Sequence, residues 1–316
     1  MNLQTQISIS KETINPISYH SKILLMGSCF SENMGLKLSY YKFQSSQNPF
    51  GILFHPKAIE NLITNAINEK SYTEDDVFFL NERWHCFDAH SSLSSSNKND
   101  LLSHLNAQLK TTKKKLQEAN HIVITLGTSW VYRFIETDTI VANCHKVPQK
   151  KFLKEILTVD EIVASLEAIL VLIKLANPKA SVLFNISPVR HLKDGFTQNQ
   201  QSKSHLISAI HQVVEPRNNT HYFPSYEIMM DELRDYRFYA EDMIHPNQTA
   251  INYIWKKFEN SWFSDESKVI MKEVSSIQNG INHRAFNPDS NEHQQFLNVL
   301  KNRIKKLQEK YPFIDL

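Results

Sequence analysis

A serine and a cysteine stand side by side near the start of the chain, where an apolar run ends. The stretch 23–35 reads ILLMGSCFSENMG, so Ser28 and Cys29 directly follow Gly27. A hydroxyl at such a turn is either a helix cap or a nucleophile. A serine becomes nucleophilic only when a base lies within hydrogen-bond reach and an acid orients that base. The N–H groups of the following helix would then favour an oxyanion.

A candidate acid and base lie far downstream, in YAEDMIHPNQTAINYIWKKF at 239–258. Asp242 and His245 form a D-x-x-H pattern, and this spacing can put both side chains on the same side of one turn. Pro246 suits the start of the next helix. Ser28, His245 and Asp242 therefore predict a nucleophile, a base and an orienting acid.

Cys29 is the rival nucleophile, because thiolates react more readily and a helix N-terminus lowers the pKa of a thiol. Neighbouring residues at such a turn point in different directions, so only one of Ser28 and Cys29 can face the base. The pattern of a serine with a histidine and an acid favours Ser28. The alternative for Cys29 is a small buried residue beneath the turn.

The elements that must position these residues follow an alternating pattern. Short apolar runs at 23–26, 122–126 and 182–186 predict buried strands, with a weaker candidate at 221–223. Helical patterns at 100–119, 159–175, 201–214 and 249–263 lie between or after them, the first capped by Asn99 or Asp100. This alternation predicts an α/β fold with a mainly parallel sheet. Sites in such folds form outside the carboxyl ends of the strands.

Composition narrows the function classes. The chain has 316 residues, a net charge of +2 and 41% hydrophobic residues, which gives no reason to expect a nucleic-acid partner. No apolar stretch is long enough to span a bilayer, and the N-terminal residues lack the pattern of a signal peptide. We therefore expect a cytoplasmic protein. The three cysteines are widely spaced and predict neither a disulfide framework nor a zinc site, and no cofactor motif is present.

Two further clusters contain residues that could do chemistry. WHCFDAH at 84–90 holds His85, Asp88 and two other metal-ligand types, but the spacing fits no standard zinc motif. We favour a loop that lines a pocket, with His85 or Asp88 in contact with substrate. SPVRHLKDG at 187–195 places Arg190 and His191 past a strand end. Arg190 is predicted to hold an anion in a bidentate fork or to form an internal ion pair, and both alternatives stay open.

These stretches carry a resemblance to a known family. GSCF at 27–30, with Ser31 where alanine is usual, resembles the signature of the GSCFA family. The resemblance continues through NPFGILFHP, WHCFDAHS, TLGTSWVYR, VANCHKVP, SPVRHLKDG and YEIMMDELRDYRFYAEDMIHP, and it covers roughly 7–263. We expect one domain at 1–263. A polar extension at 264–316 is predicted to contain an amphipathic helix.

The family is similar to the wider SGNH, or GDSL-like, hydrolases. That resemblance implies a three-layer α/β/α sandwich with a mainly parallel five-stranded, flavodoxin-like sheet, and the triad Ser28, His245 and Asp242. The implied oxyanion donors are the serine N–H, a glycine at Gly51 and an asparagine in the block that here reads LGTSW, in which Ser129 stands at the asparagine position. Replacement donors or substrate contacts are then sought among Gly127, Thr128, Ser129, Asn143 and His145. Loss of one donor would lower the rate by about two to three orders of magnitude.

The resemblance implies a serine hydrolase that cleaves a small acyl ester through an acyl-enzyme, of the esterase or acetylesterase type, with an acylated saccharide as one such substrate. An acyltransferase would use the same triad. The alternative from another class is a non-catalytic module that keeps the fold and binds a carbohydrate or a protein partner. No cofactor or metal is expected, and the sequence leaves the oligomeric state open.

Overall fold

A parallel sheet of five strands forms the centre of the computed structural model, which describes residues 5–316. The first four residues, part of the N-terminal stretch considered above, lie outside the described residues. The strands run in the order β10-β9-β5-β1-β2 and comprise β1 (Lys22–Gly27), β2 (Gln44–Gln47), β5 (His121–Leu126), β9 (Ser181–Ile186) and β10 (Thr220–Phe223). Counted along the chain, this is the flavodoxin-like order 2-1-3-4-5. The expected α/β fold with a mainly parallel five-stranded sheet is confirmed.

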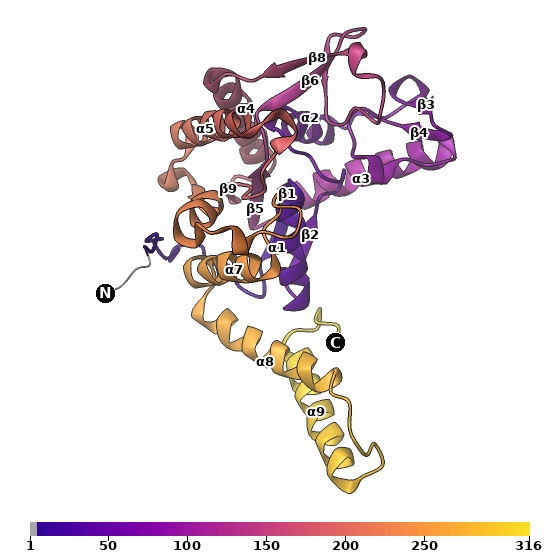
Figure 1. Ribbon diagram of the computed structural model, residues 1–316. Helices are drawn as coiled ribbons and strands as arrows, with labels where there is room; N and C mark the ends of the chain where they lie inside the picture. Colours follow the sequence, from indigo (N-terminus) through magenta and orange to yellow (C-terminus); the bar gives the residue numbers. More distant parts are fainter. Residues whose placement is uncertain (1–4) are drawn as a thin grey trace.

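Helices cover both faces of this sheet (Figure 1). The α-helices of the described residues are α1 (Cys29–Tyr40), α2 (Pro56–Ile67), α3 (Lys98–Glu118), α4 (Val159–Ala176), α5 (Phe196–Val213), α6 (Ser225–Glu227), α7 (Gln248–Trp262), α8 (Asp265–Ile281) and α9 (Asn291–Lys310). Alternate side chains of each buried strand enter different cores. In β1, Leu24 and Met26 pack with α2 to α5, whereas Ile23 and Leu25 pack with α1, α7, α8 and α9. Burial on both faces explains why these strands are continuous apolar runs.

Helix starts follow local capping chemistry more closely than the apolar pattern suggests. The helix expected from Asp100 begins at Lys98, because the Asn97 side chain accepts hydrogen bonds from the N–H groups of Asn99 and Asp100. Asn97 is therefore the cap, and the predicted Asn99 or Asp100 cap is wrong. At α4, Thr158 and Glu161 cap each other's backbone in a capping box.

Elements with little apolar pattern were not predicted. The strand β2 reads QSSQ and lies at the edge of the sheet, where solvent on its outer side removes the need for an apolar run. The stretch 71–99 contains the antiparallel pair β3 (Phe78–Leu80) and β4 (Arg83–His85). A second antiparallel sheet, β7-β6-β8, is formed by β6 (Trp130–Phe134), β7 (Thr139–Val141) and β8 (Phe152–Ile156).

The C-terminal region contains the expected amphipathic helix, α9, paired with α8. Figure 1 shows the two helices as a hairpin that extends away from the sandwich, after which the chain returns toward β2. Tyr311 and Ile314 of this returning segment are buried, and the Tyr311 ring lies 5.4 Å from that of Tyr19. The tail is thus docked on the domain. Within residues 5–316, no helix is long and apolar enough to cross a membrane.

Candidate active site

The turn from β1 into α1 carries Ser28 at the N-cap of the helix. Gly27 makes the turn in the left-handed region, with φ of +131°, and a Cβ there would lie 2.0 Å from the carbonyl oxygen of Thr125. Only glycine fits this approach between neighbouring strands. Ser28 follows at the carboxyl end of β1, and its Oγ accepts a hydrogen bond from the Phe30 N–H at 3.3 Å. The site predicted for the nucleophile therefore has the expected place in the fold.

Asp242 and His245 form a hydrogen-bonded pair on the loop between β10 and α7. Asp242 Oδ2 lies 2.6 Å from His245 Nδ1, while Oδ1 accepts from the backbone N–H groups of Ile244 and His245. These three bonds lower the pKa of Asp242 to about 2, the bonds from His245 contributing most. An ionised carboxylate at Nδ1 keeps a proton on that nitrogen and leaves Nε2 to act as an acceptor.

Ser28 and His245 are not hydrogen-bonded to each other in the described part of the chain. The His245 and Asp242 side chains are 48% and 45% exposed, whereas Ser28 is fully buried and uses its hydroxyl as a cap. Ser28 is closed to solvent, because residues 48–54 and β5 cover the turn: Leu53 N–H donates to Gly27 O, and Ser28 N–H donates to Thr125 O.

Cys29 is half-buried and lies at the first position of α1. Its pKa is raised, because burial and the charge of Glu32 outweigh the nearby backbone N–H groups and Lys203. The expected lowering by the helix N-terminus is therefore overridden, and the thiol stays protonated near neutral pH. This weakens Cys29 as the rival nucleophile.

A cavity of about 450 Å³ lies beside the loop that carries His245. Ile244, Arg190 and His191 line one side, and the aromatic side chains of Phe54, Trp130 and Tyr132 contribute elsewhere; the remaining lining residues are His55, Thr128, Val141, Ala142, Asn143, Cys144, Leu192, Lys193 and Asp194. Ser28 is not among the lining residues. The cavity offers room for a small molecule at the carboxyl ends of β5 and β9.

Of the two alternatives for Arg190, the internal ion pair is wrong. Its guanidinium donates to the carbonyl oxygen of Met243 and lies 4.0 Å from the centre of the Tyr239 ring. No ion pair of Arg190 occurs among residues 5–316. The guanidinium contacts a backbone acceptor and aromatic rings in place of the expected acidic side chain. Through the bond to Met243, Arg190 supports the loop that carries Asp242 and His245.

Lys203 is a site residue that the sequence analysis missed. It projects from α5 and is fully buried, and its ammonium donates to the carbonyl oxygens of Gly127 and Ser187, each at 2.7 Å. Burial lowers its pKa to about 7. The lysine thus joins the loops after β5 and β9. A single lysine in a polar helix forms no recognisable sequence pattern. Lys203 becomes buried only where α5 meets the loops after β5 and β9 in the folded chain.

His191 lies between Lys203 and the His245 loop. Its Nε2 is buried without a partner among the described residues, and a Cβ on Gly127 would come within 3.0 Å of it. Burial first, and then the charges of Lys203 and His245, lower the pKa of His191 to about 3. His191 is therefore a neutral imidazole at the cavity wall, brought close to the predicted base.

Comparison with known families agrees with these motifs. Residues 22–258 match the GSCFA family, and residues 274–316 match the C-terminal domain of GSCFA domain proteins. The chain belongs to the GSCFA family. In this GSCFA chain, Ser31 replaces the alanine of the signature, and its buried hydroxyl donates to the Met26 carbonyl oxygen, which satisfies the extra polar group.

Solved structures resemble the GSCFA chain only distantly. A carbohydrate esterase family 3 protein from Talaromyces cellulolyticus is 8% identical with a TM-score of 0.37, and the match covers 81% of this chain and 99% of that one. An acetyl esterase mutant crystallised with acetate is 9% identical, with a TM-score of 0.37 and coverages of 80% and 99%. The acetyl xylan esterase Est2A of Butyrivibrio proteoclasticus is 10% identical, with a TM-score of 0.35 and coverages of 84% and 65%. Likenesses of this strength do not establish an activity. No curated protein is significantly similar to the chain.

His85 and His145, two other residues predicted for the site, pack against each other away from Ser28. The rings of His85 and His145 lie 4.8 Å apart. His85 bonds through both nitrogens, to Ser94 and Leu80, and His145 Nε2 bonds to the Cys86 carbonyl oxygen. Burial lowers the pKa of His145 to about 4. These contacts identify both as packed core histidines, and neither reaches the cavity of His191.

Asp88 lies in a second cavity, of about 620 Å³, where it accepts a hydrogen bond from Tyr72 and faces Lys70 at 3.5 Å. The structure thus separates Asp88 from the Asp242–His245 pair. Among residues 5–316, no three His, Cys, Asp or Glu side chains converge as a metal site.

Proposed function

We propose that this GSCFA protein is a serine-dependent esterase that acts on a small acyl ester, such as an acylated saccharide. The observation that carries the proposal is the Asp242–His245 pair. Its carboxylate is fixed by two backbone N–H groups and bonds Nδ1 at 2.6 Å, which leaves Nε2 without a hydrogen bond to residues 5–316. A histidine oriented in this way is prepared to act as a general base.

The proposed reaction forms and releases an acyl-enzyme. Ser28 Oγ attacks the ester carbonyl carbon while its proton passes to His245 Nε2. The tetrahedral intermediate collapses, the bond to the alcohol oxygen breaks, and that oxygen takes the proton from His245. Water then attacks the acyl-Ser28 ester with His245 again as base, and the acid leaves. An acceptor alcohol in place of water would make the protein an acyltransferase.

The reaction requires Ser28 to exchange its capping bond for one to His245. The existing Oγ bond to Phe30 N–H is long, at 3.3 Å, so rotation of the hydroxyl away from it costs little. Catalytic hydrogen bonds are often long or unformed without substrate and tighten in the complex. The exposed His245 loop and the cavity next to Ile244 provide the place where a substrate would bring the groups together.

Labelling with a fluorophosphonate probe tests the proposal, because such probes need an activated serine but no known substrate. Mapping of the labelled peptide should identify Ser28, and Ser28→Ala should abolish the label. His245→Ala should slow labelling by about a hundredfold or more. Cys29→Ser should retain the label on Ser28, and this result distinguishes the two candidate nucleophiles. Absence of label on folded protein would contradict the esterase.

A non-catalytic binding module is the second candidate function. The observation that favours it is the complete burial of Ser28 and its use as a helix cap. This candidate predicts no labelling together with saturable binding of an acetylated oligosaccharide that is recovered intact. The esterase predicts release of acetate from the same ligand.

A further inference from the structure

The donors that the sequence suggested for an oxyanion are already in use. Ser28 N–H bonds to Thr125 O at 3.0 Å, Gly51 N–H to Asn48 O at 2.8 Å, and Gly127 N–H to Phe54 O at 2.7 Å. The Thr128 and Ser129 donors are engaged as well: Thr128 N–H with Phe54 O, the Thr128 hydroxyl with Ser202, and both Ser129 donors with Ser202 or its carbonyl. Of the two remaining candidates, Asn143 lines the cavity, which Ser28 does not, and His145 packs against His85. An oxyanion on Ser28 therefore needs a different donor.

Asn48 supplies an unused donor next to the nucleophile. It directly follows β2, and its N–H bonds to Leu25 O at 2.9 Å. Its Oδ1 accepts from the Gly27 N–H at 3.0 Å, while Nδ2 is buried without a partner among the described residues. Because the Gly27 N–H can only donate, the amide oxygen must face it, and the orientation of Nδ2 is thereby set.

The position of this amide is rigidly held. Asn48 has φ of +41°, in the left-handed region that asparagine tolerates better than most residues. The 48–53 segment bonds both sides of Gly27, through Asn48 Oδ1 and the Leu53 N–H. A buried primary amide with no acceptor is costly in a folded protein. Both of its Nδ2 hydrogens are thus unused, on an amide whose oxygen is bonded to the residue that precedes Ser28.

We propose that Asn48 Nδ2 donates to the oxyanion formed when Ser28 attacks an ester. The inference rests on the proposed esterase and deepens it. As the Ser28 Oγ–carbon bond forms, the carbonyl π electrons move onto the carbonyl oxygen, and the Ser28 proton passes to His245. Asn48 stabilises this negative oxygen, which returns its electrons when the alcohol leaves. A preformed donor of this kind needs no reorganisation during the reaction.

Asn48→Asp keeps an oxygen for the Gly27 N–H and replaces the Nδ2 donors by a second carboxylate oxygen, which also adds a negative charge. Asn48→Gly removes the donors without adding charge and suits φ of +41°. Asn120→Asp is the matched control: Asn120 Oδ1 accepts from Lys22 N–H at 2.8 Å, at the opposite end of β1. Phosphonylation of Ser28 should slow by about 10²- to 10³-fold in both Asn48 variants. Asn120→Asp should react like the wild type.

The outcomes separate this inference from the proposed function. Ser28 labelled at the wild-type rate in both Asn48 variants would overturn the inference and leave the esterase standing. No labelling of wild-type Ser28 would overturn both. If the variants fail to fold, the wild type still gives the answer by NMR. Phosphonylation should move the Asn48 side-chain amide protons downfield, and unchanged resonances would overturn the inference.

Discussion

Arg190 donates a hydrogen bond from its guanidinium to the carbonyl oxygen of Met243, inside the turn that carries Asp242 and His245. Met243 has φ of +56°, and the Arg190 backbone N–H also donates to Ile244 O at 3.1 Å. The segment that follows β9 thus holds Met243, two residues before the candidate base, in a left-handed conformation. Arg190 is a positioning residue in the proposed mechanism.

Arg190→Met should slow labelling of Ser28 by about tenfold to a hundredfold, since small displacements of a catalytic group cost that much. The His245 Nδ1 proton should also lose its downfield NMR resonance, a change that lower stability alone does not produce. Arg237→Met is the control, because Arg237 is exposed and pairs with Asp235. Normal labelling with an unchanged resonance would show that Arg190 only packs.

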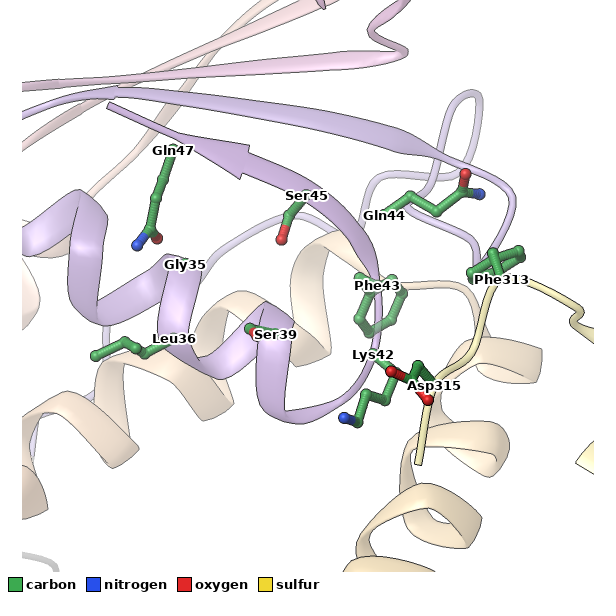
Figure 2. Close-up of a pocket in the computed structure, with 10 residues that line it drawn as sticks. All are labelled: Gly35, Leu36, Ser39, Lys42, Phe43, Gln44, Ser45, Gln47, Phe313 and Asp315. Carbon is green, nitrogen blue, oxygen red and sulfur yellow. The ribbon is translucent and has the colours of Figure 1, made fainter. Parts of the chain in front are cut away.

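Gly27→Ala and Gly35→Ala should differ sharply in the free energy of unfolding. At Gly27 a Cβ meets the Thr125 backbone at 2.0 Å with φ of +131°, so we expect a loss above about 4 kcal/mol or no folding. At Gly35 the Cβ meets Gln47 Oε1, the end of a flexible side chain. Figure 2 shows Gln47 reaching from β2 toward α1 in an open pocket, where it has room to turn.

Gly35→Ala should therefore change stability by no more than about 1 kcal/mol, because alanine also favours the helix. Urea denaturation of both variants measures the difference. Similar losses in the two variants would contradict the strand-contact argument for Gly27.

Lys203 should make stability depend on pH. Its pKa is lowered by burial to about 7 in the folded chain, against 10.5 when unfolded. Between these values the unfolded chain binds more protons, so the free energy of unfolding rises with pH, by up to about 1.4 kcal/mol per pH unit. Below pH 7, Lys203 is charged in both the folded and the unfolded chain, so the full free-energy cost of burying its charge lowers the stability.

Denaturation of wild type and Lys203→Met from pH 6 to 10 measures this effect as a difference between the two proteins. The wild type should gain stability relative to the variant above pH 7. Lys150→Met, at an exposed position, should follow the wild type at every pH. A constant difference between wild type and Lys203→Met would contradict a lowered pKa.

Removal of the tail after Lys310 should destabilise the domain without changing the reactivity of Ser28. The tail buries Tyr311 and Ile314 near Tyr19, before the amino end of β1, whereas Ser28 lies beyond its carboxyl end. We expect a loss of about 3–5 kcal/mol in the free energy of unfolding, as for loss of a large buried side chain. The labelling rate of folded protein should be unchanged.

Phe313→Ala is the control for this truncation, because Phe313 remains partly exposed at the pocket in Figure 2. Phe313→Ala should lower the free energy of unfolding much less than the truncation does. A truncated chain as stable as the wild type would show that the tail packs only loosely.

The sequence predicted the fold where burial leaves a pattern. Strands β1, β5, β9 and β10 are apolar because both faces are covered, so their approximate positions could be predicted. Strand β2 could not be predicted, because one of its edges is free and needs no apolar run. Helices α2 and α8 were not predicted either. Asp242 and His245 could be paired in advance, since a spacing of three residues within one turn is a local property.

The sequence by itself determined the alternation of the buried strands with helices, the turn that presents Ser28 and the local pairing of Asp242 with His245. Only the tertiary structure decided which hydrogen-bond donors near Ser28 remain unpaired, because the other donors bond to segments that are distant in the sequence. The Phe54 carbonyl takes the Gly127 N–H, and the Gly27 N–H fixes the Asn48 amide. The burial of Lys203 and the support of Met243 by Arg190 likewise depend on elements that meet only in the folded chain.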